Sequence, residues 1–130
     1  MPSIFSKIIA GEIPCTRVWE SPHHLALLDI RPVQLGHTLV VPKREVSYLF
    51  DLSVEEYEAL WRAVRTVEAK LREALGCERV VISVVGWEVP HVHVHLHAGR
   101  RPTARLHVQQ RDGSNSRKTN NSFSPRTLFS

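Results

Sequence analysis

Four of the chain's eight histidines stand at alternate positions in the run V-P-H-V-H-V-H-L-H: His91, His93, His95 and His97. Side chains alternate between the two faces of a β-strand, so a strand over 89–97 would present all four imidazoles on one face. The interleaved apolar residues Val92, Val94 and Leu96 would then face the core. Such a row of imidazoles can supply nucleophiles, proton donors or metal ligands.

Transfer of a nucleotidyl group to histidine is one chemistry that suits this row. A neutral imidazole nitrogen is a competent nucleophile toward phosphorus, and flanking imidazoles can donate hydrogen bonds to the phosphate oxygens. Neighbouring imidazoles also disfavour one another's protonation, which helps to keep the attacking ring neutral. A site of this kind needs no metal ion.

Metal binding is the second chemistry that the row permits. Alternate histidines on a strand can bring two or three nitrogens to one zinc ion, with a carboxylate or water completing the coordination. Asp29, Glu88 or His37 would supply a further ligand if the fold brings it near. The remaining interpretation is that the histidines simply form a solvent-exposed polar face. This interpretation is the weakest of the three, because four histidines are improbable at alternate positions by chance.

Two helices must help to position these residues. Apolar residues at helical spacing predict a short helix near the N-terminus, and Gly11 and Pro14 end it. A long helix begins after Ser53, which can cap it together with Glu56 three residues later, and Gly76 follows its end. One apolar stripe runs along this second helix: Tyr57, Leu60, Trp61, Val64, Val67, Leu71 and Leu75.

Five short apolar runs predict strands, at residues 16–19, 25–30, 38–41, 79–85 and 89–97. Their close succession favours an antiparallel sheet of about five strands, built from hairpins. With the N-terminal helix and the long central helix on one side of that sheet, the domain belongs to the α+β class.

The chain's basic character is confined to its C-terminal part. The whole chain has a net charge of +4 and a pI near 9.5, but residues 1–99 hold 10 basic and 12 acidic side chains, a net −2. Residues 100–130 hold seven basic and one acidic side chain, and 11 of these 31 residues are Ser, Thr or Asn. We therefore predict a domain over 1–99 and a basic, polar tail over 100–130 that has too few apolar residues to fold.

Cysteine content and hydropathy suggest a cytoplasmic protein. Cys15 and Cys77 cannot form a disulfide framework and are expected to be reduced thiols. The sequence has no apolar run of membrane-spanning length and no signal-peptide core at its start, so we expect no membrane partner.

The run His91-Val92-His93-Val94-His95-Leu96 resembles the motif H-φ-H-φ-H-φ-φ of the histidine-triad (HIT) family of nucleotide-binding proteins, in which φ is apolar. Further stretches are similar to the family's ordered motifs: I-F-S-K-I-I-A-G-E-I-P at 4–14, L-L-D-I-R-P at 27–32 and G-H-T-L-V-V-P-K at 36–43. The stretch E-V-P-H at 88–91 is similar to the residues that lead into the triad in bacterial members of the family. The resemblance covers roughly residues 3–97 and implies the family's fold, activity and homodimeric pairing through the long helix and a strand edge.

The resemblance implies a role for each triad residue. His93 would attack the α-phosphorus of a nucleoside 5′-phosphate derivative, such as a phosphoramidate or a dinucleoside polyphosphate, and water would then release the nucleoside monophosphate. His95 would donate a hydrogen bond to the phosphate oxygens. His91 and His37 would orient the nucleophilic ring and fix its tautomer.

Substrate-binding residues follow from the same resemblance. Asp29 would accept the ribose hydroxyls, and Phe5, Ile8 and Ile30 would line the slot for a purine base. Ser83 stands near the position of a family asparagine that adjoins the triad. Trp87-Glu88 replaces a Gln-Ser or Gln-Thr pair that contacts phosphate, so Glu88 brings a negative charge toward the substrate.

The sequence departs from zinc-bearing members of the family at its start, where Ser3-Ile4-Phe5-Ser6 replaces their C-x-x-C motif. We therefore expect no metal and no cofactor, and a nucleotide hydrolase or transferase is the leading hypothesis. A non-catalytic nucleotide-binding protein is the main alternative, and a metal-binding protein is a weaker one. Only the tail suggests nucleic acid, and it has neither interleaved aromatic residues nor a known binding motif.

Overall fold

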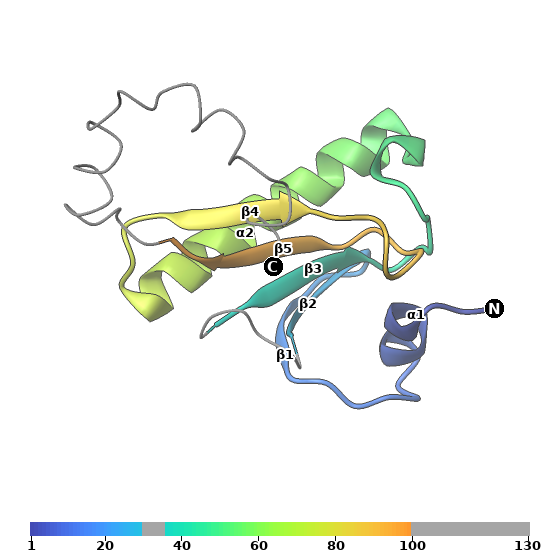
Figure 1. The fold of residues 1–130 in the computed structure, drawn as a ribbon, viewed down its shortest axis with the longest axis horizontal. Coiled ribbons are helices and arrows are strands. Elements are labelled where there is room, and N and C mark those ends of the chain that lie inside the picture. The colour runs from blue at the N-terminus through green and yellow to red at the C-terminus, as the bar shows by residue number, and fades with distance from the viewer. Residues whose placement is uncertain (30–35, 100–130) are drawn as a thin grey trace, which may run out of the picture. The chain divides into compact units, whose positions relative to one another are not determined.

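The computed structural model describes residues 1–29 and 36–99. In chain order, the elements of these residues are α1 (Ile4–Ile9), β1 (Arg17–Glu20), β2 (His24–Leu28), β3 (Thr38–Pro42), the 3-10 helix η1 (Leu49–Asp51), α2 (Val54–Leu75), β4 (Val80–Val84) and β5 (Val94–Ala98). The strands form one antiparallel sheet in the order β1-β2-β3-β5-β4 (Figure 1). The predicted α+β fold, with five strands, a short N-terminal helix and one long helix, is confirmed.

Local sequence accounts for the bounds of α2. The Ser53 hydroxyl accepts a hydrogen bond from the Glu56 backbone N–H, and the Glu56 carboxylate accepts one from the Ser53 N–H. Gly76 ends the helix in the left-handed conformation, with φ of 63°. The predicted capping box and terminal glycine are both confirmed, because each depends only on residues that are neighbours in the sequence.

The two helices cover opposite faces of the sheet, so their predicted placement on one side is wrong. Along β2, Ala26 packs into the cluster beneath α2, whereas Leu25 and Leu27 pack into the cluster that contains Phe5 and Ile8 of α1. Along β3, Val40 faces α2 while its two neighbours face α1. Consecutive apolar residues give these central strands two apolar faces, and each face requires a cover.

The last strand begins later than predicted, at Val94 instead of residue 89. Its pairing with β3 runs from Val94 opposite Val40 to Leu96 opposite Thr38. Pro90 has no N–H to donate to a ladder, and the Val92 N–H donates to the carbonyl of Val46 in the segment after β3. His91 and His93 therefore precede the strand, and only His95 and His97 lie within it.

Two predictions fall outside the described residues. Ile30, expected in the base slot, lies in the stretch 30–35, and the predicted tail occupies 100–130. Among the described helices, none has the length and apolarity that crossing a membrane requires.

Candidate active site

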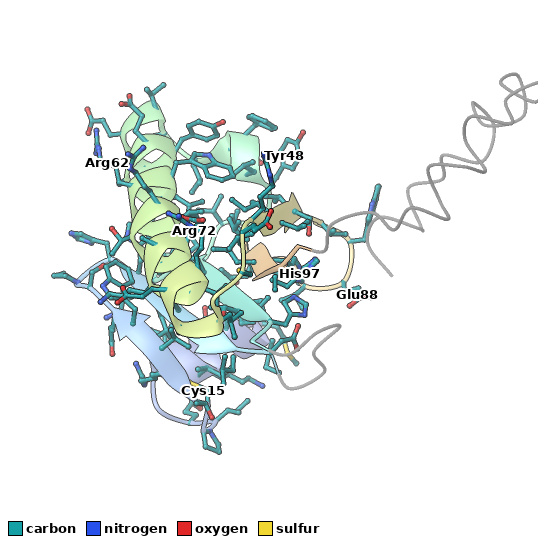
Figure 2. All side chains as sticks on the ribbon, turned by 90° about the vertical axis from the view of Figure 1, so that its left-hand side faces the viewer. Cys15, Tyr48, Arg62, Arg72, Glu88 and His97 are labelled. Carbon is teal, nitrogen blue, oxygen red and sulfur yellow. The ribbon has the colours of Figure 1, made fainter. Side chains whose placement is uncertain are left out.

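Despite the late start of β5, the apolar row faces the core as expected. Val92, Val94 and Leu96 are buried in the cluster beneath α2. Figure 2 shows the labelled His97 and Glu88 on the side of the sheet away from α2, whose Arg62 and Arg72 are labelled.

The imidazoles of His93, His95, His37 and His97 form a continuous row on that side. The ring centroids are 5.0 Å apart between His93 and His95, 5.1 Å between His95 and His37, and 5.7 Å between His37 and His97. The structure thus brings together two histidines of β5, His93 from the segment before β5, and His37 from the position immediately before β3.

His93 is held by the backbone of the residue two positions before it. Its Nδ1 donates a hydrogen bond to the His91 carbonyl at 2.7 Å, so the lone pair of the neutral ring lies on Nε2. The side chain is buried, and the Phe5 ring lies 5.0 Å away, centroid to centroid. In the neutral ring, this arrangement leaves the lone pair of Nε2 unengaged by the described residues.

His91 is completely buried, and both nitrogens of its ring are hydrogen-bonded. Its Nε2–H donates to the Pro42 carbonyl at 2.7 Å, and its Nδ1 accepts from the Ser3 hydroxyl at 2.6 Å. Burial lowers the pKa of His91, although the Pro42 carbonyl and the Glu45 charge oppose that shift. The ring is therefore neutral at pH 7 with its proton on Nε2.

His37 contacts His95, whereas the resemblance implied that it would orient the nucleophilic His93. Nε2 of His37 lies 2.9 Å from Nδ1 of His95, and its Nδ1 lies 3.7 Å from the Asp29 carboxylate. Burial lowers the pKa of His37, and burial together with the neighbouring histidines lowers the pKa of His95 to about 4. Both rings are therefore neutral at pH 7, and one of the two facing nitrogens donates a hydrogen bond to the other.

The expected substrate-binding residues occupy different places around this row. Ser83 of β4 pairs with His95 across the ladder, so both lie on one face of the sheet. Phe5 packs against His91 and His93, while Ile8 belongs to the apolar core beneath α1. Glu88 is exposed in the segment between β4 and β5.

Within the described part of the chain, Asp29, His37 and His95 present donor atoms that lie within 4.8 Å of one another. Two imidazoles and a carboxylate suit a divalent transition-metal ion. Of the ligands considered in the metal hypothesis, Asp29 and His37 thus lie beside a triad histidine, and Glu88 is outside this group.

Three residues of the site were not singled out by the sequence: Ser3, Ser6 and Glu45. The Glu45 carboxylate accepts hydrogen bonds from the Ser3 backbone N–H at 2.7 Å and from the Ser6 hydroxyl at 2.6 Å. These bonds lower the pKa of Glu45 to about 2. The two serines were noticed only as replacements for cysteines, and no sequence pattern marked Glu45.

Comparison with known proteins shows the family to which the chain belongs. The model of the HIT domain family matches residues 10–102, and the chain belongs to the histidine-triad (HIT) family. A purine nucleoside phosphoramidase of Escherichia coli K12 is 37% identical over 105 residues, covering 75% of this chain and 87% of the relative. An adenosine 5′-monophosphoramidase of Schizosaccharomyces pombe is 34% identical over 105 residues, covering 78% and 76%.

The fold is also similar to that of solved structures. A HIT family hydrolase from Legionella pneumophila superposes with a TM-score of 0.68 at 34% identity, covering 79% of this chain and 97% of the other. Family membership and fold therefore agree.

Proposed function

We propose that this protein is a nucleotide hydrolase or transferase that acts on the α-phosphate of a purine nucleoside 5′-phosphate derivative through a nucleotidyl-histidine intermediate. The observation that carries the proposal is the hydrogen bond from His93 Nδ1 to the His91 carbonyl, which leaves Nε2 of a neutral ring as the nucleophile. The relatives named phosphoramidases and hydrolases support the same class of reaction.

In the proposed reaction, His93 Nε2 forms a bond to the α-phosphorus while the bond from phosphorus to the leaving nitrogen or oxygen breaks. The leaving group takes the electron pair of that bond and gains a proton. Water then attacks the same phosphorus, the P–N bond to His93 breaks, and the lone pair returns to Nε2. The nucleoside monophosphate leaves with the oxygen of the water.

His95 is proposed as the hydrogen-bond donor to the phosphate. If His37 Nε2–H donates to His95 Nδ1, the proton of neutral His95 lies on Nε2 and faces away from His37. This tautomer can donate to a phosphate oxygen and stabilise the charge that develops there. Asp29, beside His37, is proposed to accept the ribose hydroxyls, and Phe5 to contact the base.

Ile8, Ile30 and Ser83 complete the proposed substrate contacts. Ile8 would support the base slot from within the core beneath α1, and Ile30 follows Asp29 directly in the sequence. Ser83 lies beside His95 on the same face of the sheet and can donate its hydroxyl proton to the phosphate.

The activity is tested by incubating the protein with adenosine 5′-phosphoramidate and measuring the release of AMP. We expect turnover, together with a mass increase of one adenylyl group on His93 in rapidly quenched samples. His93→Ala should lower the rate at least about 10³-fold because the nucleophile is lost. Full activity in His93→Ala would show that the assigned mechanism is wrong.

A non-catalytic nucleotide-binding protein is the second candidate. It is favoured by the exposed Trp87-Glu88 pair, because in the place that the resemblance implies the Glu88 carboxylate would oppose the binding of an anionic phosphate; Trp87 is 93% exposed. Binding of AMP without turnover of any phosphoramidate would favour this candidate. Zinc binding in equilibrium dialysis, lost in His37→Ala, would instead favour the weaker metal hypothesis.

A homodimer in the cytoplasm is proposed as the working state. β4 is an edge strand and exposes Val81 and Ile82, each 41% accessible. On α2, Trp61 has its indole N–H buried without a hydrogen-bond partner among the described residues. A second copy that pairs along β4 and α2 would cover this apolar surface, as the family resemblance implies.

A further inference from the structure

The segment that carries the proposed nucleophile is not fixed by the sheet. The ladder of β5 begins at Val94, so His91 and His93 precede it. Two hydrogen bonds to the end of β3 and to the segment after it hold them instead: His91 Nε2–H donates to the carbonyl of Pro42, the last residue of β3, at 2.7 Å, and Val92 N–H donates to the Val46 carbonyl at 2.8 Å. Orientation at His93 therefore depends on contacts that a regular strand would not need.

The N-terminal cap of α1 supplies the other half of this support. The Ser3 hydroxyl accepts the Ser6 N–H at 3.0 Å and donates its own proton to His91 Nδ1 at 2.6 Å. Ser3 is itself buried, and its bond links two segments 88 positions apart in the chain. The cap of a six-residue helix is thus joined directly to a triad histidine.

Glu45 forms hydrogen bonds with the residues of that cap. Its Oε1 accepts both the Ser3 backbone N–H and the Ser6 hydroxyl, so one carboxylate oxygen holds the first turn of α1 against the segment after β3. The same segment, through Val46, holds Val92. Glu45 therefore joins α1 to the backbone that positions the triad.

The consequences reach His93 by two routes. The His91 carbonyl accepts the hydrogen bond that fixes the His93 tautomer. Phe5, carried by α1, lies 5.0 Å from the His93 ring and 5.7 Å from the His91 ring. A shift of α1 or of His91 would move the nucleophilic nitrogen or its apolar neighbour.

We propose that Ser3 and Glu45 are positioning residues for the nucleotidyl transfer. They clamp α1 onto His91 and thereby fix the orientation and tautomer of His93, without touching the reacting atoms themselves. The catalytic consequence rests on the proposed function, whereas the effect on the two histidine rings does not.

The rings are examined first, without nucleotide, by nitrogen-15 NMR of the full chain. In the wild type we expect slowly exchanging signals for His91 Nε2–H and His93 Nδ1–H, since both rings are buried and bonded. Ser3→Ala and Glu45→Ala should broaden both signals or replace them with a mixture of tautomers. Glu20→Ala is the matched control, because the Glu20 carboxylate also accepts two hydrogen bonds, but it lies on β1 and its donors are Arg17 and Lys43.

Turnover of adenosine 5′-phosphoramidate is then measured below the unfolding transition of every variant. Glu45→Ala and Ser3→Ala should lower kcat about 10- to 100-fold, the loss expected when a reacting group is misplaced by a fraction of an ångström to an ångström. Glu45→Gln keeps an oxygen in the place of Oε1, so it should remain within about threefold of the wild type and restore the ring signals. Glu20→Ala should match the wild type in both measurements.

The outcomes separate this proposal from the proposed function. Unchanged ring signals in Glu45→Ala and Ser3→Ala would overturn the positioning proposal, as would a Glu45→Gln variant no better than Glu45→Ala. If the wild type shows no turnover but the alanine variants lose the ring signals, the proposed activity fails while the positioning role stands.

Discussion

At the scale of single residues, the site shows how one residue type acquires different properties from its surroundings. His91 is sealed in the core with both nitrogens bonded, whereas His93 keeps one nitrogen unengaged by any described residue. His95 forms a hydrogen bond with His37 through Nδ1. Each assignment follows from the partner of one ring nitrogen, because that partner decides where the proton of a neutral imidazole lies.

The low pKa of His95 predicts a loss of stability in mild acid. Its pKa is about 4 in the folded protein against 6.5 ordinarily, so between these values the unfolded chain binds a proton that the folded chain does not. The free energy of unfolding should therefore fall as the pH drops from about 6.5 to about 4, by at most about 3 kcal/mol from this group. His24, His37 and His91, whose pKa values are also lowered, add to the loss.

Urea unfolding at pH 7.5 and pH 5 measures this effect. His95→Gln should lose less stability between the two pH values than the wild type, because glutamine does not titrate. An equal loss in both proteins would contradict the low pKa of His95.

At the scale of elements, the glycine that precedes His37 lies against the last residue of α2. Gly36 precedes His37 and adopts a φ of 79°, and a Cβ built on it would lie 2.8 Å from a methyl group of Leu75 at the end of α2. Gly76 has a similar φ of 63°, but a Cβ there would meet nothing within 4 Å. Both glycines adopt a positive φ that other residues disfavour. At Gly36, the absent side chain also leaves room for Leu75, which no described neighbour requires at Gly76.

This pair predicts different costs for the same substitution. Gly76→Ala should lower the free energy of unfolding by about 1 kcal/mol, the backbone cost alone. Gly36→Ala should cost about 1 kcal/mol more, because the end of the half-buried Leu75 side chain must also move to another rotamer. It should further disturb the His37 ring, which is visible as a change in its NMR signals. Equal losses of stability in the two variants would contradict the close approach to Leu75.

At the scale of the whole molecule, the edges of the sheet determine how copies can associate. β1 and β4 are the two edge strands, and both expose apolar side chains: Val18 on β1, and Val81 and Ile82 on β4. An edge strand offers unpaired backbone groups to a partner. The proposed homodimer uses the β4 edge, since α2, the other surface proposed to pair, packs against β4.

The proposed dimer is tested by sedimentation velocity. The wild type should sediment with about twice the 14.8 kDa mass of one chain. Ile82→Asp should shift it toward the monomer by placing a charge in the interface, and Val18→Asp on the opposite edge should leave it dimeric. A monomeric wild type, or equal effects of the two substitutions, would contradict pairing through β4.

Much of the fold followed from short-range patterns. The bounds of α2 rest on Ser53, Glu56 and Gly76, which act on their own neighbours, and β2 and β3 appear as apolar runs within two residues of their observed ends. The late start of β5 could not be predicted, because Val92 bonds Val46 instead of a strand. The contact between His37 and His95 was not predicted, because it joins residues that are 58 positions apart in the sequence.

The sequence by itself determined the family, the identity of the triad and the face of Val92, Val94 and Leu96 that enters the core, because motif order and alternation are local properties of the chain. Tertiary structure alone decided which face each helix covers, which histidine His37 contacts, and that Ser3 and Glu45 support His91. These features depend on hydrogen bonds between groups brought together by folding, and a side chain's partner across 42 or 88 positions is not encoded in its neighbours.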